Sequence, residues 1–209
     1  MENKYILAFF LVLIALGACS TTIPLQTNLD NQTLLSAENK NMKANFTLTS
    51  EIPDGVIEQV YVNKSGSETR SQELNYQPAT AFNDIWSSYF NNKFNDFSTD
   101  QMNIDAVLVD LHLKENSATS VGVQLLTGNK KSNVEAVAVV DVEVEYLGEI
   151  YETQIEVSSS EYQETQSTNY GTISKENPME QRSLLLQSVL NRSIVQFDNF
   201  VSQVLASQE

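Results

Sequence analysis

The side chains that could do chemistry in this 209-residue chain fall into three groups. Cys19 is the only cysteine and His112 the only histidine. Carboxylates alternate with apolar residues in two neighbouring segments, at Asp141, Glu143, Glu145, Glu152 and Glu156. Carboxylate oxygens suit a hard cation such as Ca²⁺ or a basic partner, whereas a metal site or a proton shuttle at a lone histidine needs further groups beside it.

Cys19 stands just after a short apolar segment. The twelve residues from Tyr5 to Leu16 are apolar, and Lys4 precedes them. A charged tip and a short apolar core indicate a secretory signal, because a membrane-spanning helix needs about 20 apolar residues. Leu16-Gly17-Ala18-Cys19 resembles the lipobox of bacterial lipoproteins. That resemblance implies a lipid on the Cys19 thiol, cleavage before Cys19 and acylation of the new amino group.

Two other interpretations of this start remain open. One is an ordinary secretory signal with an unmodified Cys19, and the other is an uncleaved membrane anchor. By the lipoprotein resemblance, Ser20 favours the outer membrane, since an Asp at that place favours retention in the inner membrane. We therefore expect a protein anchored by acyl chains such as palmitate to the periplasmic face of the bacterial outer membrane.

The composition bounds the rest of the chain. A hydrophobic content of 41% is enough for the core of one domain, and a single cysteine excludes a disulfide within the chain. The formal net charge of −15 argues against nucleic acid or anionic lipid headgroups as electrostatic partners. It fits a basic partner, divalent cations or simple solubility, and no motif indicates a cofactor.

We predict three parts: a lipoprotein signal peptide at 1–18, a lipidated flexible tether at 19–45 and a single α+β periplasmic domain at 46–209. The tether is rich in Asn, Thr, Ser and Gln and shows no sustained period, so it is not expected to order itself. A flexible coil of about 25 residues spans roughly 25–30 Å on average, which would lift the domain off the membrane.

Two amphipathic helices are predicted in the domain. Residues 79–97 carry aromatic side chains at helical spacing, from Phe82 to Phe97, with Thr80 as the N-cap. Such a stripe is typical of a helix packed on a sheet, although it can also bind a lipid or a cofactor. Residues 178–205 follow Asn177 and begin with Pro178, which together are typical of a helix start.

The remaining segments predict strands. The runs 46–50 and 56–62 flank Pro53-Asp54-Gly55 and predict a hairpin. Residues 104–113 predict a central strand, with further strands at 120–127, from about 134, and after 148. One face of this central strand carries Val107, Val109, Leu111 and Leu113. The fold class is therefore α+β, with a largely antiparallel sheet of about five to six strands backed by the two helices.

The strongest local pattern is a hairpin across Gly148-Glu149, where a Gly-X pair suits a type II′ turn. The predicted register sets Leu147 opposite Ile150, which pairs Glu145 with Glu152 and Asp141 with Glu156. The five acidic residues then share the face opposite to the buried one. They could hold a cation or meet a basic partner, and the alternative is an ordinary solvated face.

The order of elements suggests a known type of lipoprotein. A lipobox, a polar leader, an aromatic helix around Phe82 to Phe97, strands and a C-terminal amphipathic helix resemble the YajG-like lipoproteins and, more distantly, the auxiliary lipoproteins of ABC-type lipid transporters. The resemblance carries over no functional residue except Cys19. It implies an envelope protein that binds a partner or lipid and catalyses nothing. The sequence also lacks Gly-x-Ser-x-Gly, His-Glu-x-x-His and a phosphate-binding loop.

We therefore expect a non-catalytic binding or assembly component of the bacterial cell envelope, anchored to the membrane through its N-terminal lipid. Its contact would be the acidic sheet face or a sheet edge, with an envelope protein or lipid as partner and no nucleic acid. The alternative is an auxiliary lipid-binding component of an ABC-type lipid transporter. That carrier would leave apolar side chains exposed in a groove between helices and sheet, whereas an assembly component would bury them.

Overall fold

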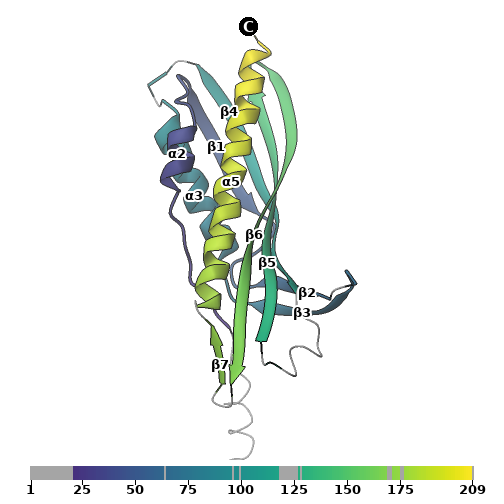
Figure 1. Cartoon of the computed structure of the whole chain (residues 1–209). Coiled ribbons are helices and arrows are strands. Elements are labelled where there is room, and N and C mark those ends of the chain that lie inside the picture. Colours follow the sequence, from purple (N-terminus) through teal and green to yellow (C-terminus); the bar gives the residue numbers. More distant parts are fainter. Residues whose placement is uncertain are drawn as a thin grey trace, which may run out of the picture.

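The computed structural model of the chain covers most of the predicted domain (Figure 1). The predicted signal peptide, Cys19 and nearly all of the predicted strand at 120–127 lie outside the described residues. The described ranges are 21–63, 65–95, 97–98, 100–117, 127, 129–168, 171–174 and 177–208.

The described residues form one mixed sheet of seven strands with helices against it, which confirms the α+β class. The strands are β1 (Lys43–Ser50), β2 (Ile57–Val62), β3 (Glu68–Leu74), β4 (Gln101–Ser117), β5 (Asn129–Tyr146), β6 (Glu149–Thr168) and β7 (Gly171–Ser174). Their order is β3-β2-β4-β5-β6-β7, and β1 also pairs with β4. The pairs from β4 to β7 and the pair β2–β3 are antiparallel, whereas β1 and β2 each run parallel to β4.

The predicted hairpin between 46–50 and 56–62 is wrong. Strand β1 pairs with 101–108 of β4, and β2 pairs with 113–116 of the same strand, so the two lie one after the other along β4. The turn at Pro53-Asp54-Gly55 therefore separates two successive segments of one sheet edge. Strand β2 forms its hairpin with β3 instead, which projects from the body of the molecule (Figure 1).

Helix α5 (Pro178–Ala206) runs along one face of the sheet for most of its length (Figure 1). Its predicted start is confirmed, because Asn177 is the N-cap and its Oδ1 accepts from Met179 N at 3.1 Å. The predicted apolar stripe is buried as well, at Leu186, Leu190, Ile194, Phe197, Val201 and Val204. None of the helices in the described part of the chain is long and apolar enough to cross a membrane.

Helix α3 (Pro78–Lys93) begins one residue before the predicted start at 79 and ends four residues before the predicted end at 97, and its N-cap differs from the prediction. Gln77 is the N-cap, and Thr80 lies in the first turn. Asp54 from the preceding turn satisfies the helix start instead, since its Oδ1 accepts from Thr80 N at 3.1 Å. The helix ends before Phe97, which is 97% exposed and does not belong to the stripe.

The core between α3, α5 and the sheet is aromatic. Phe82, Trp86, Tyr89 and Phe197 are all fully buried, and the rings of Trp86 and Phe197 lie 5.2 Å apart. The polar atoms of these side chains are satisfied by α5, because Trp86 Nε1 donates to Ser193 Oγ at 3.2 Å and Tyr89 donates to Asp198. The two helices are thereby fixed to one another as well as to the sheet.

A β-bulge in β4 reverses the predicted faces of its first half. The register against β5 shifts between Leu108 and Asp110. Ile104, Ala106 and Leu108 therefore point into the core before the bulge, and Leu111 and Leu113 do so after it. A strict alternation across the whole strand cannot reproduce this, because one extra residue changes the phase.

Residues 21–42, which we call the leader, pack against the domain. Ile23 is 2% exposed and Met42 is 6% exposed, and the leader contains the short helix α2 (Asn31–Ser36). This packing differs from the flexible tether predicted at 19–45, and β1 already begins at Lys43. The polar composition of the leader predicted a coil, but polar side chains of α5 form hydrogen bonds with its backbone groups.

Candidate functional site

All five acidic residues predicted to share a face lie on the outer face of the sheet, which the helices do not cover. Asp141, Glu143, Glu145, Glu152 and Glu156 are exposed, whereas their neighbours Val142, Val144 and Ile155 are buried. The face assignment is therefore correct. The structure adds Asp105 of β4, which sequence reasoning missed because the bulge reverses the predicted faces of that strand.

The predicted pairing of these residues is wrong by two positions. Leu147 and Gly148 form the turn, with φ of 53° and 82°, and Tyr146 lies opposite Glu149. Positive φ at both central residues is the pattern of a type I′ turn, not of the type II′ turn predicted at Gly148-Glu149. A shift of two residues keeps every side chain on its face and changes only its partner.

The observed register creates a row of three carboxylates across three strands. Asp105 of β4 lies opposite Glu143 of β5, which in turn lies opposite Glu152 of β6. Directly opposed residues in an antiparallel pair have Cβ atoms about 4.5–5.5 Å apart, and like charges at that separation destabilise the sheet. The carboxylates of this row therefore repel one another, and a basic partner would relieve this repulsion.

The neighbouring acids differ in having amide partners. Asn103 Nδ2 donates to Glu145 Oε2 at 2.9 Å, and Gln154 Nε2 donates to Asp141 Oδ1 at 2.8 Å. Within the described residues, none of the three carboxylates in the row makes a hydrogen bond of this kind. The row borders a surface hollow of about 600 Å³, lined by Asp105, Val107, Asp141, Val142, Glu143, Glu152, Thr153 and Gln154.

The acidic face does not form a closed ligand set. Among the residues that the structure describes, no three His, Cys, Asp or Glu side chains are grouped closely enough to hold a metal ion. The carboxylates instead form a surface with separated charges and a partly apolar floor at Val107. Such a surface can attract basic groups over a broad area, which is the geometry of a protein contact.

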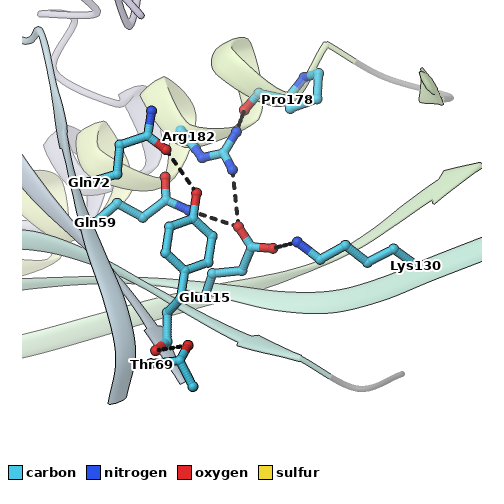
Figure 2. A network of polar contacts seen from close by, with 8 residues as sticks. Gln59, Thr69, Gln72, Glu115, Lys130, Pro178 and Arg182 are labelled. Atoms are coloured by element: carbon cyan, nitrogen blue, oxygen red, sulfur yellow. Dashed lines mark hydrogen bonds and ion pairs between the residues drawn. The ribbon is translucent and has the colours of Figure 1, made fainter. Parts of the chain in front are cut away.

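A second polar cluster is buried beside the start of α5 (Figure 2). Glu115 of β4 is 4% exposed, and its Oε2 accepts from Gln59 Nε2 at 2.8 Å and from Arg182 Nη2 at 3.2 Å. Its other oxygen, Oε1, is paired with Lys130 Nζ. The cluster joins β2, β4, β5 and α5 through one carboxylate.

The charges around Glu115 keep it ionised. Burial by itself raises the pKa of Glu115, but the hydrogen bond from Lys130 and the charges of Lys130 and Arg182 outweigh it, so the pKa lies below its usual value. Sequence reasoning missed this cluster, since Glu115 and Arg182 are far apart in the chain and no local pattern links them. We interpret the cluster as structural, because the charge of Glu115 is compensated by Lys130 and Arg182.

His112 also has a partner that the sequence analysis did not use. Its Nδ1 lies 2.8 Å from Asp110 Oδ2, two residues earlier on the same face of β4. The hydrogen bond with Asp110 raises the pKa of His112, and the same contact lowers the pKa of Asp110. Both side chains are partly exposed, beside a hollow of about 430 Å³ that Glu58 also lines.

Comparisons with known proteins give a limited context. No family model matches the chain, and no curated protein matches it. A crystal structure of an uncharacterized protein is similar with a TM-score of 0.38 and 10% identity, covering 89% of this chain and 99% of that one. A crystal structure of a Xanthomonas campestris protein of the family model DUF330 is similar with a TM-score of 0.46 and 6% identity, covering 90% and 98%. Both scores are low, so the proposals below rest on the chain's own residues.

Proposed function

We propose that this chain is a lipid-anchored, non-catalytic binding component of the bacterial cell envelope. In this proposal Cys19 carries the lipid, the domain lies on the periplasmic side of the outer membrane, and the outer sheet face binds an envelope protein. The lipobox-like residues before Cys19 support the anchor. The row of Asp105, Glu143 and Glu152 supports a partner with a basic surface.

The observation that carries the proposal is the filled space between the helices and the sheet. Side chains that would line an apolar groove there are buried, including Phe82, Trp86 and Phe197, each 0% exposed. Rings of neighbouring residues in this layer lie about 5 to 6 Å apart, in ordinary van der Waals contact. A lipid carrier that uses this space would have to open a close-packed core, so the packing favours an assembly component over the carrier.

The outer face offers what the core does not. It is solvent-accessible, it spans several strands, and it holds carboxylates that no hydrogen bond satisfies within the described residues. A basic surface on a partner would gain from each of these charges and would be steered toward them, because the whole chain carries a formal charge of −15. Binding of this kind weakens as salt concentration rises.

The test is recovery of the partner from crosslinked membranes. The full-length lipoprotein is purified after density-gradient fractionation and compared with Cys19→Ser and with the triple variant Asp105→Asn, Glu143→Gln, Glu152→Gln. A matched triple variant, Glu38→Gln, Glu73→Gln, Asp84→Asn, changes the net charge equally at exposed positions on other elements. We expect one protein partner with the wild type and the matched control, and its loss with the acidic-row variant.

Other outcomes would overturn the proposal in separate ways. If the Cys19→Ser protein still fractionated with membranes, the proposed lipid anchor at Cys19 would be refuted. Equal recovery of the partner with both triple variants would show that the row of Asp105, Glu143 and Glu152 is not the contact. Stoichiometric phospholipid in the eluate without a protein partner would favour the carrier instead.

A further inference from the structure

The leader follows α5 along most of its length. Polar side chains on one side of the helix hold the leader, at positions 183, 187, 191 and 202. From the start of the helix onward, Ser183 Oγ donates to Pro24 O, Gln187 Nε2 donates to Asn28 O at 2.6 Å, Asn191 Oδ1 accepts from Asp30 N at 2.8 Å, and Lys40 Nζ donates to Ser202 Oγ at 2.9 Å. The leader and α5 therefore run in the same direction.

The first described residues are fixed at the N-terminal end of this arrangement. Asn75 N donates to Thr21 O at 3.0 Å, and Ile23 N donates to Asn75 O at 2.9 Å. Ile23 is 2% exposed. The chain is thus held by two backbone hydrogen bonds and a buried side chain from Thr21 onward.

This attachment leaves very little chain between the domain and the lipid. Only Ser20 stands between Cys19 and Thr21. Consecutive Cα atoms are at most about 3.8 Å apart, so Cys19 Cα lies within about 8 Å of Thr21 Cα in any conformation. A lipid on Cys19 therefore cannot be far from the surface around Thr21 and Asn75.

We infer that the end of the domain around Thr21 and Asn75 rests directly on the bilayer surface, with the β5–β6 turn pointing away from it. This inference rests on the proposed lipidation of Cys19. It replaces the picture of a domain lifted off the membrane by a long tether. The contact surface is the end of the domain around Thr21 and Asn75, and its partner is a lipid bilayer.

Exposed apolar side chains lie beside this attachment. Gly55 N donates to Tyr76 O at 2.7 Å, which brings Val56, 42% exposed, close to Asn75. Leu25 and Leu184 adjoin the contact of Pro24 with Ser183 and are 38% and 49% exposed. The acidic chain gains nothing from anionic headgroups, so the lipid and these apolar groups must supply the contact.

The far end of the molecule is marked by the end of α5. Gln208 Nε2 donates to Glu149 Oε2 at 2.9 Å, beside the β5–β6 turn. From Ser183 to the end of α5 at Ala206 the helix rises by about 35 Å at 1.5 Å per residue. Ile150, 63% exposed in β6, therefore lies far from the bilayer in this orientation, and Val56 lies close to it.

The experiment compares a fluorophore at these two positions. Full-length lipoproteins with Val56→Cys or Ile150→Cys are purified from membranes, labelled on the introduced thiol, and placed in phosphatidylcholine vesicles that contain a lipid with a quencher on its headgroup. Thermal melts first show that each labelled variant is folded. We expect strong quenching at Val56→Cys and little or none at Ile150→Cys.

A matched control changes only the length of the link. A Gly-Ser insertion of about 20 residues between Ser20 and Thr21 spans roughly 22–27 Å on average and should abolish most of the quenching at Val56→Cys. Equal quenching at the two positions, or quenching at Val56→Cys that survives the insertion, would overturn the inference.

The labelling itself separates this inference from the proposed function. An acylated Cys19 has no free thiol, so each variant should take up one fluorophore per chain. Two fluorophores per chain would mean that Cys19 is unmodified, and the proposed lipid anchor would fail. One fluorophore per chain with equal quenching at both positions would leave the anchor intact and refute only the orientation.

Discussion

Replacing Asp198 by Asn should destabilise the fold strongly, because Asp198 compensates a buried ammonium group. Its Oδ1 lies 3.2 Å from Lys40 Nζ and accepts from the Tyr89 hydroxyl at 2.7 Å. The side chains of Lys40 and Asp198 are only 3% and 10% exposed. Burial, and then the hydrogen bond to Asp198, raises the pKa of Tyr89 far above its usual value, so Tyr89 remains a neutral donor.

The size of the effect follows from the burial of this pair. Removing one member of a buried ion pair costs about 3–5 kcal/mol, because the other charge is left without compensation. Asn at position 198 keeps the size of the side chain and an acceptor for Tyr89, so the loss is confined to the charge. For a domain of this length, about 2–4 °C of Tm is lost per kcal/mol, and we expect a fall of about 10 °C.

The assay is urea unfolding of the chain from residue 19 with Cys19→Ser, followed by circular dichroism. Adding Lys40→Met to Asp198→Asn removes the uncompensated charge, so the double variant should regain about 2 kcal/mol. Asp84→Asn, at an exposed position of α3, is the matched control and should change the free energy of unfolding by less than about 0.5 kcal/mol. A double variant as unstable as the sum of the two single variants would refute the compensating role of Asp198.

Three further substitutions test other parts of the fold. Because the pKa of His112 is raised, its contact with Asp110 stabilises the fold below pH 6.5, and this stabilisation is lost as pH rises through the folded pKa. The pKa of Asp110 is lowered, so its carboxylate contributes to the contact above pH 3.8. Unfolding curves should therefore show a larger loss of stability for His112→Gln at about pH 5.5 than at about pH 9. Because the pKa of Glu115 is lowered, the ionised carboxylate stabilises the fold above pH 4.5. Glu115→Gln should therefore lower the free energy of unfolding by about 3 kcal/mol at neutral pH. Unfolding measured at falling pH should show the difference between the variant and the wild type narrowing below pH 4.5. Leu147→Asn should raise the unfolding free energy by about 0.5–1 kcal/mol, because Asn tolerates the φ of 53° at this exposed turn, and equal urea midpoints would contradict this.

Features set by neighbouring residues could be predicted from the sequence. The start of α5 depends on Asn177 and Pro178, which act on the backbone within one turn of the helix. The face that carries Glu143 and Glu152 depends only on alternation along a strand, and a shift of two residues in the hairpin leaves it unchanged. The α+β class follows from the same periodicities.

The partners within the acidic face could not be predicted in the same way. They depend on the turn at Leu147 and Gly148, where a leucine takes a left-handed conformation that its own preference does not favour. The bulge after Leu108 is equally hidden, since no residue type marks it, and it brings Asp105 to the face of Glu143. Both features are decided by how whole strands fit together.

The leader shows most clearly what tertiary structure adds. By itself, the sequence of residues 21–42 describes a polar coil, because its few apolar side chains cannot order it. Helix α5 presents side chains such as Gln187 and Asn191 to its backbone, and Asp198 to Lys40, and these contacts exist only after the helix has packed on the sheet. The sequence alone thus determined the presence of the two long helices, the faces of the hairpin formed by β5 and β6, and the anchor-like Cys19. Tertiary structure decided the register, the buried charge pairs and the position of the leader, because these depend on groups that lie far apart in the chain.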